Sequence, residues 1–346
     1  MAKAGVHLGA RQTGGIGRRS LLGLLGGAAA TAIWPLPSNA DQADRLRRIG
    51  VLSGFAHDDP EAHLRASSFE KGLRDLGWIR GRNLQIDYRS AGDGSFLQSY
   101  ASQLVSLAPE LILANSTPVA AALQKQTRTV PILFVQVTDP IGQGFVKTLA
   151  QPGGNLTGII NFEFSIGSKW LQVLKEAAPH VTRVGLVFNP DTAPFADLFI
   201  RPIEAIAPSF AITPTTASGR DAAELERAIK AFAANPHGAL VVLPDVSAAN
   251  HRDQIIALAA RHRLPTIYPY RLFAASGGLM SYGSDVADIY RRIASYVDRI
   301  LRGEKPADLP VRAPVNYELV INLRSAKAIH LEVPPGLLTL ADEVIE

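Results

Sequence analysis

Short apolar runs alternate with amphipathic stretches along the chain from residue 48 onward. The first run, RIGVLSG at residues 48–54, is followed by apolar side chains at helical spacing in residues 61–76, which Gly77 ends. Continuous apolar strands that alternate with helices are typical of a parallel, doubly wound sheet covered on both faces, so the pattern predicts an α/β fold. The strands expected in this first half are residues 48–54, 83–90, 111–114, 131–137 and 155–161, and the helices are residues 61–76, 96–107 and the segment that begins near Pro118.

The pattern then restarts at RVGLVFN, residues 183–189, which repeats the order of Arg, Gly and aliphatic residues in the first run. Further strand and helix units follow it, so we expect a second α/β lobe similar to the first. Its expected strands are residues 183–189, 210–214, 237–245 and 265–268, and its expected helices are residues 221–234 and 250–262. A strand at 279–285 and a helix at 286–302 are expected after them.

The elements after Gly278 exceed what the second lobe needs, which suggests that the chain crosses back to the first lobe and then returns. Such crossings form a hinge. We expect lobe one to comprise residues 45–162 plus 283–310, and lobe two residues 163–282 plus 311–346. Ligands of open α/β sheets bind outside the carboxyl ends of the strands, so two facing lobes predict one central ligand cleft.

Residues 1–40 have the features of an export signal. An arginine pair at 18–19 precedes an uncharged core at 21–33, and SNA at 38–40 supplies small residues for cleavage after Ala40. The arginine pair predicts the twin-arginine route, while departures from the usual flanking residues leave general secretion open. A membrane anchor is the less favoured alternative, because the core is shorter than the roughly 20 residues of a membrane span.

The charge balance and the absence of cysteine exclude several classes of partner. The chain has 35 basic and 31 acidic residues, and four of the basic ones lie in residues 1–40, so the remainder is formally neutral. A neutral chain lacks the basic footprint of a nucleic-acid-binding protein. With no cysteine there is no disulfide, thiolate metal site, cysteine nucleophile or lipid attachment site. We expect an exported monomer in the periplasm, without a stable membrane anchor.

Motifs of catalysis are missing from the sequence. It contains no G-x-S-x-G, H-E-x-x-H or Walker pattern. PGGNLTG at 152–158 precedes a strand, which favours a turn. HDDPEAH at 57–63 is better explained by a helix that starts at Asp59-Pro60 than by a metal site. We therefore predict no enzyme, no catalytic residue, no metal and no cofactor.

Polar and aromatic residues instead follow the ends of several expected strands. In LANSTPVAAAL, residues 113–123, an apolar run leads directly into a helix N-terminus with capping residues, which suits an anion. Capping and turn chemistry account for part of the wider pattern. The remainder predicts a cleft for a small carboxylate, with Ser116 and Thr117 on the carboxylate, Asp139 or Asp245 on an amine, and tyrosine rings against an apolar body. The candidate ligand residues are Ser53, Phe55, Ser116, Thr117, Thr138, Asp139, Asn189, Asp245, Tyr268 and Tyr282.

Four segments carry a resemblance to a known family. They are residues 117–159, which include TDP, PGGN and TG, and residues 268–285, 296–311 and 318–329, which include GGLMSYG and ELVINLRSAKAI. From about residue 45 to 346 the chain resembles the periplasmic substrate-binding proteins of an ATP-binding cassette (ABC) transporter family. The resemblance implies the type I periplasmic-binding-protein fold, in which two doubly wound lobes joined by three hinge crossings close on a ligand.

Some relatives in that family are linked to tryptophan or tyrosine uptake. The resemblance implies contacts from Ser116, Thr117, Thr138 and Asp139 in lobe one, and from Asn189 and Asp245 in lobe two. The chain departs from the family in both lobe-two segments, since VFNPDTAPF lacks the expected Glu-Asn-Ser and LPDVSAAN has Val246 at an often polar position. An amino acid and a carboxylate without an amine therefore both remain open as ligands.

The resulting prediction is a receptor that closes around a small carboxylate-bearing ligand and delivers it to the membrane subunits of an ABC permease. Two alternatives use the same cleft. One is an exported enzyme that acts on a small carboxylate, and the other is a ligand sensor for a signalling partner.

Overall fold

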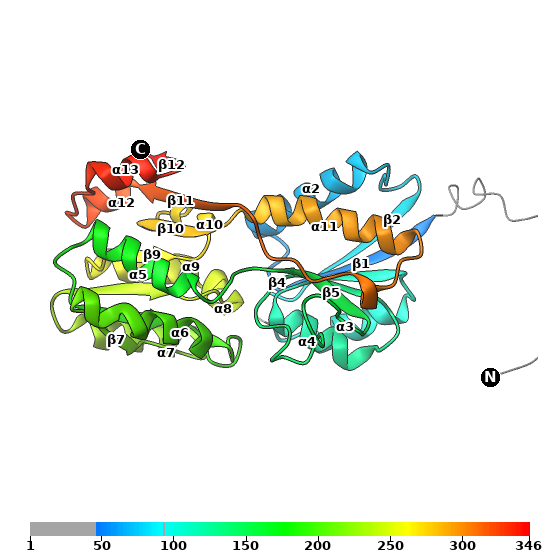
Figure 1. Ribbon diagram of the computed structural model, residues 1–346, viewed down its shortest axis with the longest axis horizontal. Coiled ribbons are helices and arrows are strands. Elements are labelled where there is room, and N and C mark those ends of the chain that lie inside the picture. The colour runs from blue at the N-terminus through cyan, green and yellow to red at the C-terminus, as the bar shows by residue number, and fades with distance from the viewer. Residues whose placement is uncertain (1–45, 93) are drawn as a thin grey trace, which may run out of the picture. The chain divides into compact units, whose positions relative to one another are not determined.

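The computed structural model describes residues 46–92 and 94–346. The predicted export signal, its twin-arginine pair and cleavage after Ala40 lie outside the described residues. Within these residues the strands form two separate sheets, each covered by helices (Figure 1). We call each sheet with its helices a lobe.

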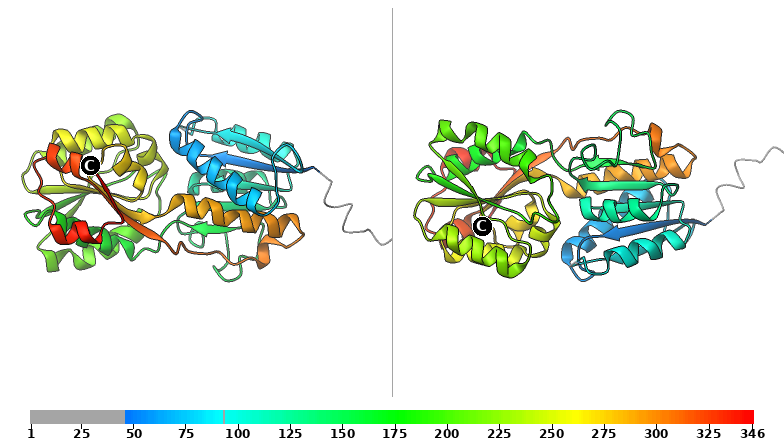
Figure 2. Two further views of the ribbon diagram at one scale, coloured as in Figure 1. Left: turned by 90° about the horizontal axis from the view of Figure 1, so that it is seen from above. Right: turned by 90° about the horizontal axis from the view of Figure 1, so that it is seen from below.

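Lobe one is built on a five-stranded parallel sheet in the order β2-β1-β3-β4-β5. Helices α2 and α11 cover one face of this sheet, and α3 and α4 cover the other, so the predicted doubly wound arrangement is confirmed (Figure 2). The strands are β1 (Arg47–Ser53), β2 (Leu84–Ser90), β3 (Leu111–Asn115), β4 (Ile132–Val137) and β5 (Leu156–Ile160), and the helices are α2 (Pro60–Asp75), α3 (Leu97–Ser106), α4 (Thr117–Gln126) and α11 (Val286–Leu301).

Lobe two is built on a seven-stranded sheet in the order β12-β11-β10-β9-β8-β6-β7. Its strands are β6 (Arg183–Val187), β7 (Thr213–Thr216), β8 (Gly238–Val242), β9 (Thr266–Tyr268), β10 (Met280–Ser284), β11 (Tyr317–Asn322) and β12 (Glu343–Ile345). Its helices are α5 (Ile166–Ala177), α6 (Ala196–Ile206), α7 (Ala222–Ala233), α8 (Val246–Asn250), α9 (Arg252–Arg261), α10 (Arg271–Ala275), α12 (Leu323–Ala328) and α13 (Pro335–Leu340), with a 3-10 turn η1 (Ala207–Phe210).

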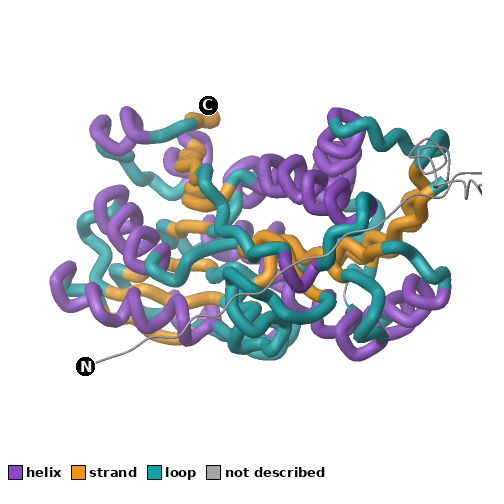
Figure 3. Tube along the Cα trace, turned by 45° about the vertical axis from the view of Figure 1, so that its right-hand side comes forward, coloured by secondary structure: helices purple, strands orange, loops and turns teal. Residues whose placement is uncertain are grey.

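The chain passes between the lobes three times: from β5 to α5, from β10 to α11, and back to β11 after the short 3-10 turn η2 (Pro306–Asp308) (Figure 3). The last two crossings explain why β10 and β11 form the one antiparallel pair in the described sheets. Strand β10 runs toward lobe one and β11 returns from it, so neighbouring strands at this position must run in opposite directions. The boundaries predicted for the two lobes stay a prediction.

Two expected elements differ in detail. The strand expected at 210–214 is instead the turn η1 followed by β7. The single helix expected at 250–262 is two helices, α8 and α9, which meet at His251 with φ −97° and ψ 18°. The helical segment begins at Val246, four residues earlier than expected, because Asp245 caps α8. None of the helices within the described residues combines the length and apolar character that a membrane span requires.

The cores follow the lobes, with one exception at the interface between them. Trp170 and Phe199 lie in the apolar cluster of lobe two, and their rings are 5.5 Å apart. Phe55, which follows β1 of lobe one, is 3% exposed and belongs to the same lobe-two cluster. Phe55 thus joins the two lobes by apolar contact.

Candidate functional site

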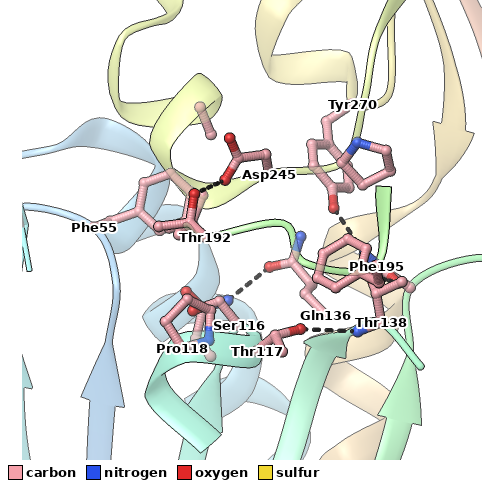
Figure 4. Close-up of a pocket in the computed structure, with 15 residues that line it drawn as sticks. Phe55, Ser116, Thr117, Pro118, Gln136, Thr138, Thr192, Phe195, Asp245 and Tyr270 are labelled. Atoms are coloured by element: carbon pink, nitrogen blue, oxygen red, sulfur yellow. Dashed lines mark hydrogen bonds between the residues drawn. The ribbon is translucent and has the colours of Figure 1, made fainter. Parts of the chain in front are cut away.

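A cavity lies between the lobes, at the carboxyl ends of β3 and β4 of lobe one and beside the loops that follow β6 and β8 of lobe two (Figure 4). We call it the interlobe cavity. It leaves about 30 Å³ of free volume, which is room for about one water molecule. Pockets for small organic ligands are typically about 300–1,000 Å³, so the lobes must separate before such a ligand can enter. The cavity is lined by Phe55, Asn115, Ser116, Thr117, Pro118, Gln136, Thr138, Asn161, Thr192, Phe195, Pro244, Asp245, Val246, Ala249 and Tyr270.

Ser116 stands where β3 leads into α4. It is the N-cap residue of α4 by position, but its side chain makes no capping hydrogen bond, and its buried hydroxyl has no hydrogen-bond partner. Its backbone has φ 89° and ψ 159°, a region that only glycine adopts readily. A strained residue with an unsatisfied hydroxyl at a helix N-terminus places an available donor beside the positive end of the helix dipole. This arrangement suits a carboxylate.

Backbone strain recurs at the same edge of lobe one. Gln136 and Asp139, at the end of β4 and just after it, also have positive φ values of 55° and 51°. The amide of Asn115 donates to Gln136 Oε1 at 2.8 Å and fixes the side chains at the ends of β3 and β4. Strained backbone tends to gather at ligand sites, where the surrounding structure holds it.

A chain of hydrogen bonds extends across the floor of the cavity into lobe two. The backbone N–H of Thr138 donates to Thr117 Oγ1 at 3.1 Å, and the Thr138 hydroxyl donates to Asn161 Oδ1 at 2.9 Å. Asn161 Nδ2 then donates to the Tyr270 hydroxyl at 3.2 Å. Burial raises the pKa of Tyr270 to about 12, so the phenol is protonated at neutral pH and keeps its own O–H for donation.

Asp245 is the one carboxylate among the residues that line the interlobe cavity. Its Oδ1 accepts from the Thr192 hydroxyl and from Ser247 N at 3.0 Å, and its Oδ2 accepts from Asn189 N at 2.9 Å and Ala248 N at 3.3 Å. Desolvation raises the pKa of this carboxyl, and the four hydrogen bonds oppose that rise. Two carboxylate oxygens offer about four acceptor positions, so Asp245 is fully used as the cap of α8 and the anchor of the loop after β6.

Direct contacts hold the two lobes together beside the cavity. Arg252 of α9 forms a two-pronged ion pair with Asp59, the N-cap of α2, at 2.7 Å and 3.3 Å. Asn250 Nδ2 donates to the carbonyls of Gly54 at 3.0 Å and Gly92 at 2.8 Å. We call Asp59, Arg252 and Asn250 the interlobe latch. The lobes therefore adopt a closed arrangement.

Half of the predicted ligand residues meet in the interlobe cavity. In lobe one the structure brings together the start of α4 and the ends of β1 and β4. Asp245 of lobe two lines the same cavity. Their contact with a ligand stays a prediction. The five residues are Phe55, Ser116, Thr117, Thr138 and Asp245.

The other five predicted residues lie elsewhere. Ser53 lines a separate cavity of lobe one. Asn189 supports Asp245 through its backbone N–H, and Asp139 accepts from Gly142 N at 3.0 Å in a turn. Tyr268 stacks on Phe273 inside lobe two at 4.8 Å, and Tyr282 stacks on Tyr317 at 6.1 Å.

The sequence prediction missed several residues of the cavity wall, among them Gln136, Asn161, Thr192 and Phe195. Thr192 and Phe195 lie in a loop without periodicity, and Gln136 is hidden inside an apolar strand. Asn161 was available from the sequence, because it is the last residue of the expected strand 155–161, and Asn115 likewise stands at the end of the expected strand 111–114.

The chain is similar to known proteins over most of its length. A tyrosine-binding protein of Clostridioides difficile (strain R20291) is 27% identical over 289 residues, which are 83% of this chain and 82% of that protein. The solved structure of an ABC domain in complex with L-Trp, from Streptococcus pneumoniae, is 25% identical with a TM-score of 0.79, covering 86% of this chain and 99% of the other.

More distant structures share the fold alone. A periplasmic binding protein/LacI transcriptional regulator from Alkaliphilus metalliredigens complexed with D-xylulofuranose has 11% identity and a TM-score of 0.55, covering 79% of this chain and 97% of the other. The fold is that of the type I periplasmic binding proteins, as predicted. Residues 48–345 match the model of the ABC transporter substrate binding protein family, and the chain therefore belongs to this family of substrate-binding proteins.

Proposed function

We propose that this protein is a periplasmic receptor of an ABC importer that closes on a small carboxylate with an aromatic or apolar body. The permease then receives the ligand unchanged. Closure is the mechanism: a ligand that contacts both lobes shifts the hinge equilibrium toward the closed state.

The observation that carries the proposal is the unpartnered, buried hydroxyl of Ser116 at the start of α4, in a cavity shared by both lobes. The N-terminus of a ten-residue helix adds a partial positive charge at this position. Phe55, Phe195 and Tyr270 supply apolar and aromatic surface to the same cavity. A ligand with a carboxylate at the start of α4 and a ring against these side chains would match both the polar and the apolar part of the cavity.

The hydrogen bonds of Asp245 bear on whether the ligand carries an amine. An ammonium group would have to displace one of four donors already bound to this carboxylate. Asp139 does not line the cavity. We therefore expect acids without an amine to bind at least as tightly as the corresponding amino acids.

Binding without chemistry is supported by the composition of the wall. Acid–base catalysis needs a titratable group within reach of the reacting atom. Asp245 is the one titratable carboxylate or imidazole in the lining, and its acceptor positions are occupied. A hydroxyl without an adjacent base is a poor nucleophile, so Ser116 is suited to hold a ligand rather than to attack it.

The test is calorimetric titration of the full chain with three matched groups of compounds. The first is L-tyrosine and L-tryptophan. The second is 3-(4-hydroxyphenyl)propionate and indole-3-propionate, which lack the amine. The third is tyramine and tryptamine, which lack the carboxylate. We expect the propionates to bind at least as well as the amino acids and the amines not to bind.

Variants of two serines then locate the carboxylate. Ser116→Ala should weaken binding of the acids about tenfold, since a hydrogen bond to a charged group contributes about 1.5–3 kcal/mol. Ser209→Ala is the matched control, because Ser209 is exposed and bonds to Ile206 O within lobe two. Equal binding of amines and acids, or an unchanged affinity in Ser116→Ala, would contradict the assignment. Recovery of a chemically altered ligand would refute the receptor function.

A further inference from the structure

A buried arginine in lobe one lacks hydrogen-bond partners. Arg65 of α2 has a side chain that is 3% exposed, and its Nε, Nη1 and Nη2 atoms are buried without a partner. Its nearest carboxylate oxygen, Glu61 Oε2, is 3.6 Å from Nη2, too far for a hydrogen bond. An arginine cannot shed its charge by losing a proton, so its burial without acceptors carries an energetic cost.

Stacking does not remove this cost. The guanidinium of Arg65 lies over the ring of Phe55 at 3.9 Å from the ring centre. A cation–π contact of this kind uses the face of the guanidinium, whereas its five N–H donors point outward in the plane. The in-plane donors therefore lack an acceptor in the structure, and an oxyanion, which guanidinium groups bind in a two-pronged manner, would supply one.

Arg65 lines a cavity of about 520 Å³ between α2 and the carboxyl ends of β1, β2 and β3. We call it the α2 cavity. It also holds the hydroxyl-bearing residues Ser53 and Ser90 and the imidazoles of His57 and His63, whose rings are 6.0 Å apart. The Ser53 hydroxyl accepts from Phe55 N at 3.1 Å, which leaves its proton free for donation. These groups are donors or possible donors to an anion.

The acidic residues of the wall are already occupied. Glu70 pairs with Arg80 at 3.2 Å and accepts the Tyr88 hydroxyl at 2.8 Å. Asp87 pairs with Arg48 at 3.4 Å. The charge of Arg65 is thus opposed in part by Glu61 and is left without a hydrogen-bonded acceptor.

We propose that the α2 cavity, which adjoins the interlobe cavity and shares Asn115 with it, is a second binding site that takes a small oxyanion on the Arg65 guanidinium. The oxyanion is a carboxylate or a phosphate. Ser53, singled out by the sequence as a ligand residue, belongs to this site.

The experiment titrates the full chain calorimetrically with inorganic phosphate and, separately, with succinate, in chloride buffer at pH 7. The two arms distinguish a phosphate from a carboxylate site. We expect at least one probe to bind, and Arg65→Met to weaken it about tenfold or more through loss of charge-assisted hydrogen bonds. Arg65→Lys keeps the positive charge but loses the paired N–H donors of the guanidinium, so its affinity for the probe should lie between those of wild type and Arg65→Met.

Two controls make the result specific. Arg80→Met removes a guanidinium from the same wall that is already paired with Glu70, and Ser116→Ala removes the donor of the interlobe cavity. Both should leave the affinity for the probe within about twofold of wild type, well below the tenfold step of 1.4 kcal/mol. Melting curves of each variant verify folding, and Arg65→Met should melt no lower than wild type because it removes an unsatisfied buried charge.

Three results would overturn the proposal. They are the absence of binding of both probes at millimolar concentration, an unchanged affinity in folded Arg65→Met, and loss of binding in Ser116→Ala but not in Arg65→Met. The last would assign the anion to the interlobe cavity.

Discussion

The interlobe latch makes a quantitative prediction about the hinge. The Asp59 and Arg252 side chains are 9% and 14% exposed and meet through two hydrogen bonds, so the pair is largely removed from solvent. Arg252→Met retains much of the apolar stem but removes both bonds. A single hydrogen bond to a charged group contributes about 1.5–3 kcal/mol, so loss of the pair should decrease the ratio of closed to open molecules by at least about 10- to 150-fold.

The assay is a distance distribution between spin labels placed on the two lobes. The chain has no cysteine, so Lys71→Cys on α2 and Ala257→Cys on α9, both exposed positions, can be labelled without background. Arg252→Met should move population from the short to the long distance. The apparent affinity for a ligand that requires closure should fall by the same factor where the open state dominates in the wild type, and by less where the closed state dominates.

The control is an arginine with a similar ion pair inside one lobe. Arg271 and Glu343 meet through two hydrogen bonds of 2.7 Å within lobe two. Arg271→Met should leave the label distances unchanged. If Arg252→Met also left them unchanged, the latch would not set the hinge equilibrium, and the reasoning would be refuted.

Two further predictions concern the close approach of the lobes. A Cβ at Gly54 would lie 2.9 Å from Val246 Cγ2 of the opposite lobe, so Gly54→Ala should favour the open state in the same label assay. Adding Val246→Ala should restore closure, and failure of that rescue would assign the effect to lobe one alone. Ser116→Gly should raise the melting temperature, because glycine adopts a φ of 89° without the backbone strain of about 1–3 kcal/mol that serine has there. It should also lower ligand affinity, because it removes the hydroxyl. A lower melting temperature in Ser116→Gly would contradict the claim of strain.

The sequence determined the elements of this protein and one wall of its cavity. Buried strands such as β3 and β4 are continuous apolar runs, and their carboxyl ends share one edge because parallel strands align there. Local chemistry was therefore enough to bring Ser116, Thr117 and Thr138 together from the sequence.

Tertiary structure decided the opposite wall. Tyr268 and Tyr270 are separated by one residue, but β9 ends at Tyr268 and the chain turns into α10, so one ring is enclosed in lobe two and the other enters the cavity. The sequence predicted Asp245 as a possible partner for an amine. Only the folded structure shows that four donors already occupy its acceptor positions.

The sequence also could not reveal that Arg65 lacks hydrogen-bond partners. This depends on how far the folded lobe places each carboxylate from the guanidinium, and Glu61 lies just beyond hydrogen-bond distance. Periodicity reports which face of an element is buried, but it carries no information about which groups from distant segments satisfy one another. That pairing is set by the packing of loops and lobes, and it decides which side chains are left for a ligand.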